Sequence, residues 1–346
     1  MDYFEKIKKW RLIIAGLFIL LGLTIISTTA IGPVSIPPSV VFKILIKKLP
    51  FLRSTVEPSW SGIEETIIFQ IRLPRIILGA LVGAALAVSG ATMQGLFKNP
   101  MADPFIIGIS SGAALGASAA IFFGISLGIY GIPILAFLGG VGAAFLVYNI
   151  ARTDGKVPVE TLLLSGIAVA TFLSALTSLL IYLAGEDLHQ IVFWLMGGLW
   201  ARNWDHVIVS FFPICLGVVG IYVFSRDLNA MLLGEEPAKH LGIEVESVKK
   251  IILFLASMIA GIAVSVSGII GFVGLIIPHI VRILVGPDHR ILLPSSALVG
   301  GIFLIWADTL ARTMIAPTEL PVGIITALFG APFFVYLLIS RKRTII

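Results

Sequence analysis

Long runs of apolar residues, broken by glycine, proline and short charged segments, follow one another along almost the whole chain. Each run is close to the ~20 residues that an α-helix needs to cross the hydrocarbon core of a bilayer. Because lipid offers the backbone no hydrogen-bond partner, such runs are expected to be helical. The pattern predicts ten spanning helices, over residues 12–31, 74–97, 104–124, 131–150, 159–184, 206–225, 249–268, 271–286, 294–315 and 322–340.

Composition supports an integral membrane protein and excludes other classes. Of the 346 residues, 58% are hydrophobic and 12% are charged, and the mean hydropathy is +1.06. A soluble domain carries about 25% charged residues, so a soluble globular protein, a disordered chain and a nucleic-acid-binding protein are all excluded. The sequence predicts an all-α polytopic membrane protein with one transmembrane domain over residues 1–346.

The N-terminal segment allows two interpretations. Lysines and an arginine between residues 6 and 11 precede an apolar stretch that ends at Ala30, as in a secretory signal peptide. The stretch is long enough to span a membrane and many further spans follow it, which favours a first transmembrane helix.

Basic residues predict the topology. With both termini in the cytoplasm, 16 of the 24 lysines and arginines fall on the inner side, and six of the other eight lie in one long outer segment. Short cytoplasmic segments are the ones that carry excess Lys and Arg. We therefore expect a multi-pass protein of the cell membrane with both ends inside.

One long polar segment, residues 32–73, falls on the predicted outer side. It is rich in proline, and within it residues 40–49 place apolar side chains near helical spacing. This spacing predicts a short helix lying on the membrane surface.

A second segment, residues 226–248, falls on the predicted inner side. It is too long for a simple turn, and its apolar residues would be exposed to solvent unless another part of the protein or a partner covers them. The segment predicts two short helices broken at Gly234 and Pro237. It is either an interfacial loop packed on its own helices or a docking site for a cytoplasmic partner.

An internal repeat relates the two halves of the chain. Residues 83–90 resemble residues 261–268 at an offset of 178, which also relates Pro100 to Pro278 and Gly108 to Gly286. Five spans separate the two segments, so the halves are predicted to have opposite orientations, as in many transporters. The alternative is a chance match between two glycine-rich helices.

The sequence predicts no catalytic site, metal site or cofactor site in this chain. Its five histidines have no metal-ligand spacing on a common helix. It has no phosphate-binding glycine loop, and its single cysteine, Cys215, cannot form a disulfide framework. A transporter of this kind would take its energy from a partner.

Polar residues at membrane depth are few. Asp308 is the clearest, and acids inside spans are functional candidates by default. The other interpretation of Asp308 is an ion pair with Arg312, one turn away. Gln94 is a further polar residue within a span, near its inner end.

Several blocks along residues 65–340 resemble the permease family of iron–siderophore, haem and cobalamin ABC importers. The blocks occur in the family's order and cover nearly the whole chain. They are Arg72-Leu73-Pro74-Arg75, residues 82–104, residues 108–113, Met196-Gly197-Gly198, Gly234-Glu235 with Ala238 and Leu241-Gly242, residues 271–279, Asp288-His289-Arg290, residues 319–323 and Gly330-Ala331-Pro332.

The resemblance implies an assembly. Such permeases have ten spans and work as homodimers above two cytoplasmic P-loop ATPase subunits that bind the ATP, and a substrate-binding protein docks from outside. It implies that residues 227–246 form the element that couples to the ATPase, and that external arginines dock the binding protein. The matching positions are Gly234, Glu235, Ala238, Leu241 and Gly242 for coupling, and Arg72, Arg75 and Arg312 for docking.

Three function classes are compared. The leading hypothesis is a permease of an ATP-driven importer that carries a ferric siderophore, haem or cobalamin inward by alternating access. The alternative is a secondary transporter driven by an ion gradient, with Asp308 as the coupling residue. An intramembrane enzyme has no catalytic cluster to support it.

Overall fold

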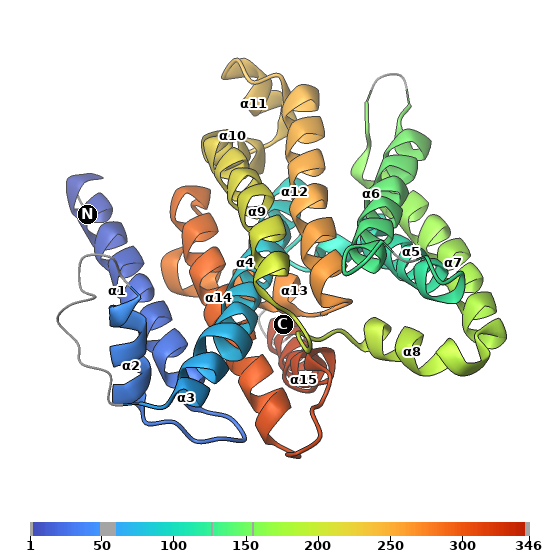
Figure 1. The fold of residues 1–346 in the computed structure, drawn as a ribbon. Helices are drawn as coiled ribbons and strands as arrows, with labels where there is room; N and C mark the ends of the chain where they lie inside the picture. The colour runs from blue at the N-terminus through green and yellow to red at the C-terminus, as the bar shows by residue number, and fades with distance from the viewer. Residues whose placement is uncertain (1–2, 49–59, 126, 154–155, 343–346) are drawn as a thin grey trace.

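The computed structural model describes residues 3–48, 60–125, 127–153 and 156–342, and helices dominate this part of the chain (Figure 1). Every predicted span falls on a helix. These helices are α1 (Tyr3–Ala30), α4 (Leu73–Leu96), α5 (Ile109–Phe122), α6 (Gly131–Ala151), α7 (Val159–Leu183), α9 (Trp204–Val223), α12 (Val245–Ser267), α13 (Val273–Val285), α14 (His289–Thr313) and α15 (Val322–Lys342).

Seven helical stretches in the described part are long and apolar enough to cross a membrane. The three other predicted spans fall on shorter apolar helices: α5, α13 and the apolar part of α15, Val322–Tyr336. At 1.5 Å per residue, the 14 residues of α5 reach about 21 Å, less than the ~30 Å of the hydrocarbon core.

The second spanning helix begins well before the prediction. α3 (Gly62–Thr66) and a π-helical stretch (Ile67–Arg72) lead into α4, so one helical run extends over Gly62–Leu96. Ser61 caps it, and a reciprocal hydrogen bond from its backbone to Glu64 completes a capping box. The end of the predicted 32–73 loop is therefore wrong, because polar residues that resemble a loop satisfy the first turn of a helix.

The predicted short outer helix is confirmed as a helix, α2 (Pro38–Lys47). The last residue of the predicted range, Leu49, lies outside the described residues. Val41 and Ile44 are buried with Ile36 and Ile68, so one face of α2 packs on the protein. Its position on a membrane surface stays a prediction.

The arrangement of helices separates the predicted inner and outer segments (Figure 1). The central helix α4 packs against α9, α12, α13 and α14, while α5, α6 and α7 form a group on one flank and α1 lies on the other. The N-terminus and helices α10 (Ser225–Leu232) and α11 (Glu235–His240) lie toward one end, and α2, α3 and the unpredicted helix α8 (Leu188–Met196) lie toward the other. The two predicted sides are thus two ends of one bundle.

Helices α4 and α12, which carry the internal repeat, run in opposite directions between these ends, as an inverted repeat requires. The 178-residue offset does not hold beyond them. Pro100 lies in a turn while Pro278 lies within α13, and Gly108 precedes a helix while Gly286 follows one. The offset fails because the connection after α12 is shorter than the one after α4.

The contact between α4 and α14 depends on two glycines. A Cβ atom on Gly83 would overlap the carbonyl oxygen of Gly300, and a Cβ on Gly300 would overlap that of Gly83. Small residues at such crossings allow helix backbones to approach closely in a membrane. This approach fixes α4 against the helix that carries Asp308.

Gly83→Val is expected to lower the free energy of unfolding by about 1–3 kcal/mol, because the added side chain forces the two backbones apart. Thermal unfolding in detergent measures the change. The control is Gly22→Val on α1, where an added Cβ meets no atom within 4 Å. Equal loss in both variants would contradict the packing account.

Candidate functional site

Helices α10 and α11 form a compact projection, called here the inner knob (residues 225–242) after its predicted side. Leu228, Met231 and Ala238 are buried and hold the knob on the bundle, where α10 contacts α4 and α14. Leu233 and Leu241 point away, with 73% and 66% of their surfaces exposed. The knob, which lies at one end of the molecule (Figure 1), therefore combines a fixed base with exposed leucines set among charged residues.

Gly234 separates the two helices of the knob, as predicted. Its φ of +136° is a conformation that side-chain-bearing residues rarely adopt. The predicted break at Pro237 is wrong, because Pro237 lies inside α11. Proline is tolerated in a first helical turn, where its missing N–H has no intrahelical partner to lose.

A lysine on α12 ties the knob to a long helix. Lys249 Nζ lies 2.7 Å from Glu235 Oε1 and 3.2 Å from Glu246 Oε1. The glutamates are partly exposed, so such pairs contribute little to stability, roughly 0–1 kcal/mol. Their effect is to orient α11 relative to the start of α12.

Asn229 joins the knob to α14. Its side chain donates to Asp288 Oδ1 at 2.8 Å and accepts from the backbone N–H of His289, also at 2.8 Å. Asp288 caps α14. Burial opposes its ionisation, but hydrogen bonds from Arg290 and Asn229 outweigh burial and hold the pKa of Asp288 below its usual value. A movement of the knob would therefore pull on the beginning of α14.

Asn229→Ala is expected to loosen this joint, since it removes the hydrogen bonds to Asp288 and His289 and costs about 1–3 kcal/mol locally. Amide hydrogen exchange should then rise in the first turn of α14 and in α10. Exchange in α7, which packs on α5 and α6, should stay unchanged and serves as the internal control. Unchanged exchange at the joint would contradict the assignment.

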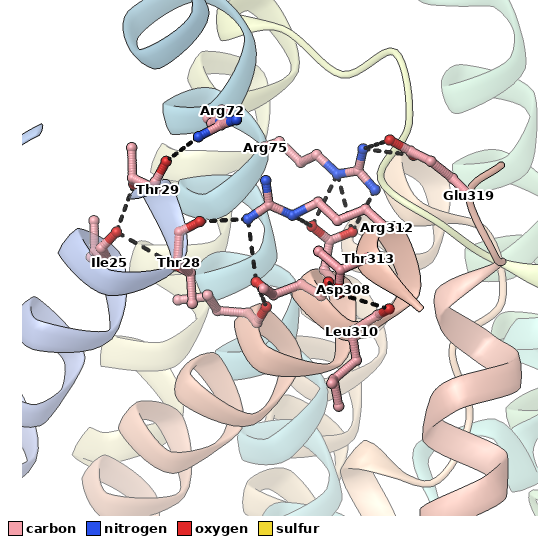
Figure 2. A network of polar contacts seen from close by, with 12 residues as sticks. Ile25, Thr28, Thr29, Arg72, Arg75, Asp308, Leu310, Arg312, Thr313 and Glu319 are labelled. Atoms are coloured by element: carbon pink, nitrogen blue, oxygen red, sulfur yellow. Dashed lines mark hydrogen bonds and ion pairs between the residues drawn. The ribbon is translucent and has the colours of Figure 1, made fainter. Parts of the chain in front are cut away.

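A polar network lies at the other end of α14 (Figure 2). The Arg75 guanidinium donates to both carboxylate oxygens of Asp308 at 2.8–3.1 Å and to both of Glu319 at 2.8–3.0 Å. Asp308 is only 2% exposed. Arg75 on α4 thus joins α14 to the segment that precedes α15.

Two further arginines extend the network to α1 (Figure 2). Arg312 Nη2 donates to the carbonyl oxygen of Thr28 at 2.6 Å, and Arg72 Nη1 donates to that of Thr29 at 2.7 Å. Both arginines are 4% exposed. The ends of α1, α4 and α14 that lie opposite the inner knob are consequently held together by side chains from three parts of the sequence.

The network changes the interpretation of Asp308. The predicted pair with Arg312 is present but long, at 4.0 Å, whereas Arg75 makes the close contacts. Glu319, which was not among the predicted site residues, completes the second branch. The three arginines predicted to dock a partner are buried within the chain, and their docking role stays a prediction.

Gln94 on α4 is buried and lies away from this network. Its amide donates to the carbonyl oxygen of Leu275 on α13 at 3.0 Å, which fits a helix-to-helix contact in a membrane. Within the described residues, no group of three His, Cys, Asp or Glu side chains could hold a metal ion.

The bundle has the inner knob at one end and, at the other, the network of Arg72, Arg75, Asp308, Arg312 and Glu319, called here the ionic clamp. These features fit a multi-pass transport protein of the permease class. The chain belongs to the FecCD transport family, which it matches over residues 17–340. Members of this family are permease subunits of ABC transporters; they are not enzymes, and a separate subunit hydrolyses ATP. Such a permease works with ATPase and substrate-binding partners.

Similar proteins support this membership. The chain is 52% identical over 288 residues to the cobalamin import system permease protein BtuC of Halobacterium salinarum, covering 82% of this chain and 77% of the relative. It is 39% identical over 341 residues to the hemin transport system permease protein HmuU of Yersinia pestis, covering 96% and 97%. A solved inward-facing metal-chelate type ABC transporter matches with a TM-score of 0.83 and 38% identity, covering 95% of this chain and 99% of that one.

These findings do not favour the alternative of a gradient-driven transporter. The relatives are ABC permeases. The carboxylate of Asp308, which the alternative needs for binding ions, is already paired with the Arg75 guanidinium. The chain is therefore the membrane-spanning permease subunit of an ABC importer.

Proposed function

We propose that this permease carries a bulky metal chelate inward, in the class of ferric siderophores, haem and cobalamin, by alternating access. The relatives named for cobalamin and hemin support the substrate class. The observation that carries the mechanism is the inner knob, which is fixed at its base and exposes two leucines at its tip. An ATPase subunit bound to this tip could transmit its motion to α12 through the Glu235–Lys249 pair and to α14 through Asn229.

The coupling residues take distinct roles in this proposal. Gly234 and Gly242, both at positive φ, shape the two turns of the knob. Ala238 packs its base, Leu241 presents an apolar contact, and Glu235 sets the angle of α11 through Lys249. The last two are the residues whose replacement tests coupling without disturbing the core.

The proposed assembly is a homodimer of this chain with two ATPase subunits below and one substrate-binding protein outside. Arg72, Arg75 and Arg312 carry three positive charges against the two negative charges of Asp308 and Glu319. In this proposal the surplus of one charge within the network attracts acidic groups of a binding protein that reach it. In this arrangement both termini lie in the cytoplasm, on the same side as the knob.

The substrate is tested by uptake of labelled ferric chelate, haem and cobalamin, measured side by side in a strain without this gene and in its parent. Loss of one of the uptakes, restored by the gene on a plasmid, names the substrate. If all three uptakes persist in the deletion strain and a binding protein encoded nearby holds none of these compounds, the proposed substrate class is wrong.

A further inference from the structure

A large groove lies between α6 and α12 and takes no part in the sites described above. Its volume is about 1030 Å³. Most of its lining is apolar, with Phe145 and Phe254 more than half exposed along it. Gly142 also lines it, and a Cβ atom there would meet nothing within 4 Å. The groove is thus open and apolar, and no other part of the described chain covers it.

The length of the groove matches one leaflet of a bilayer. On α6 it extends from Leu138 to Tyr148, and on α12 from Ser247 to Ser257. Ten helical steps of 1.5 Å make about 15 Å, which is half of the ~30 Å hydrocarbon core. The end that carries Ser247 adjoins the inner knob, so the groove covers the depth of the leaflet on that side.

Lys250 is the charged residue among those that line the groove, and it lies toward the end near the inner knob, called here the mouth. Lys250 is exposed, and no ion pair joins it to a carboxylate within the described residues. The neighbouring Lys249 is already engaged by Glu235 and Glu246. The mouth therefore presents one lysine ammonium that no described carboxylate contacts, and a lipid phosphate can reach it.

We infer that this groove binds an anionic phospholipid of the inner leaflet, with an acyl chain between α6 and α12 and the headgroup phosphate at Lys250. The apolar walls, the one-leaflet length and the charge at the mouth each fit this occupant. A zwitterionic lipid fits the walls but gains less from the charge. The assignment to the inner leaflet rests on the proposed topology, whereas the binding of an anionic lipid in the groove does not depend on the transported substrate.

The test is native mass spectrometry of the full-length chain, purified in a neutral detergent with phosphatidylglycerol or phosphatidylcholine of identical acyl chains. One lysine near an anionic headgroup is expected to favour phosphatidylglycerol roughly fivefold. Lys250→Gln should remove that preference, while Lys9→Gln, which removes an exposed lysine from the cytoplasmic end of α1, should keep it.

A second pair of variants tests the groove itself. Gly142→Phe should fill it and lower retention of both lipids, whereas Gly22→Phe on α1, where the added atoms also meet open space, should not. Equal binding of the two lipids by the wild type, or equal effects of Lys250→Gln and Lys9→Gln, would overturn the inference. So would a Gly142→Phe variant that loses self-association but keeps its lipid, because a second copy would then occupy the groove.

Discussion

Replacement of Asp308 by alanine is expected to lower the free energy of unfolding by about 3–5 kcal/mol, the cost of leaving a buried charge without its partner. The carboxylate is 2% exposed and is held by the Arg75 guanidinium through three hydrogen bonds. Its loss leaves two buried cations, Arg75 and Arg312, facing each other across the network. Chemical unfolding in mixed micelles measures the change.

Two controls separate this effect from a general loss of charge. Asp187→Ala removes an exposed carboxylate at the same end of the molecule and should change the free energy of unfolding by less than about 0.5 kcal/mol. The double variant Arg75→Met with Asp308→Leu removes the pair together, and it should recover most of the loss. If the double variant is less stable than Asp308→Ala alone, the ion pair is not what holds α4 to α14.

Leu241→Asp and Glu235→Arg are expected to abolish uptake while leaving the folded protein in the membrane. Leu241 is 66% exposed, so a charge there costs the fold little, but it would sit in the proposed contact with the ATPase. Glu235→Arg replaces the partner of Lys249 with a like charge and turns α11 out of position. Uptake and the amount of folded protein are measured on the same membranes.

The matched control is Ile63→Asp, an exposed apolar residue at the opposite end of the bundle. It should leave the coupling of ATP hydrolysis to transport unchanged. Uptake that survives both knob substitutions would show that the ATPase binds elsewhere. Loss of folded protein in either variant would show that the knob has a structural role instead.

The apolar runs were enough to predict the spanning helices, because in a membrane a run of apolar residues has almost no alternative to a helix. The turn at Gly234 was equally predictable, since glycine tolerates a backbone conformation that few other residues adopt, but the break predicted at Pro237 is wrong. The start of the second span was missed because Glu64 and Glu65 look like a loop, although acids in a first helical turn are favourable. The nine-residue helix α8 was missed because it is too short for a spanning pattern.

The ion pairs of the ionic clamp could not be predicted from the sequence, because its partners are far apart along the chain. Asp308 and Arg312 are four residues apart, so helical spacing suggested that they pair. The structure instead pairs Asp308 with Arg75, which is 233 residues away from it along the chain. Arg75 has a second partner, Glu319, which is 244 residues away from Arg75. Only the packing of α4 on α14, through Gly83 and Gly300, brings these groups together. No local pattern contains that information.

The most direct test of the account is uptake of the labelled chelate into vesicles that contain this permease with its ATPase and binding protein. Uptake is measured once with ATP and ionophores that collapse all ion gradients, and once with imposed gradients and no ATP. The account predicts accumulation in the first condition and none in the second. Accumulation that follows the gradients and ignores ATP would contradict an ABC importer and return Asp308 to consideration as a coupling residue.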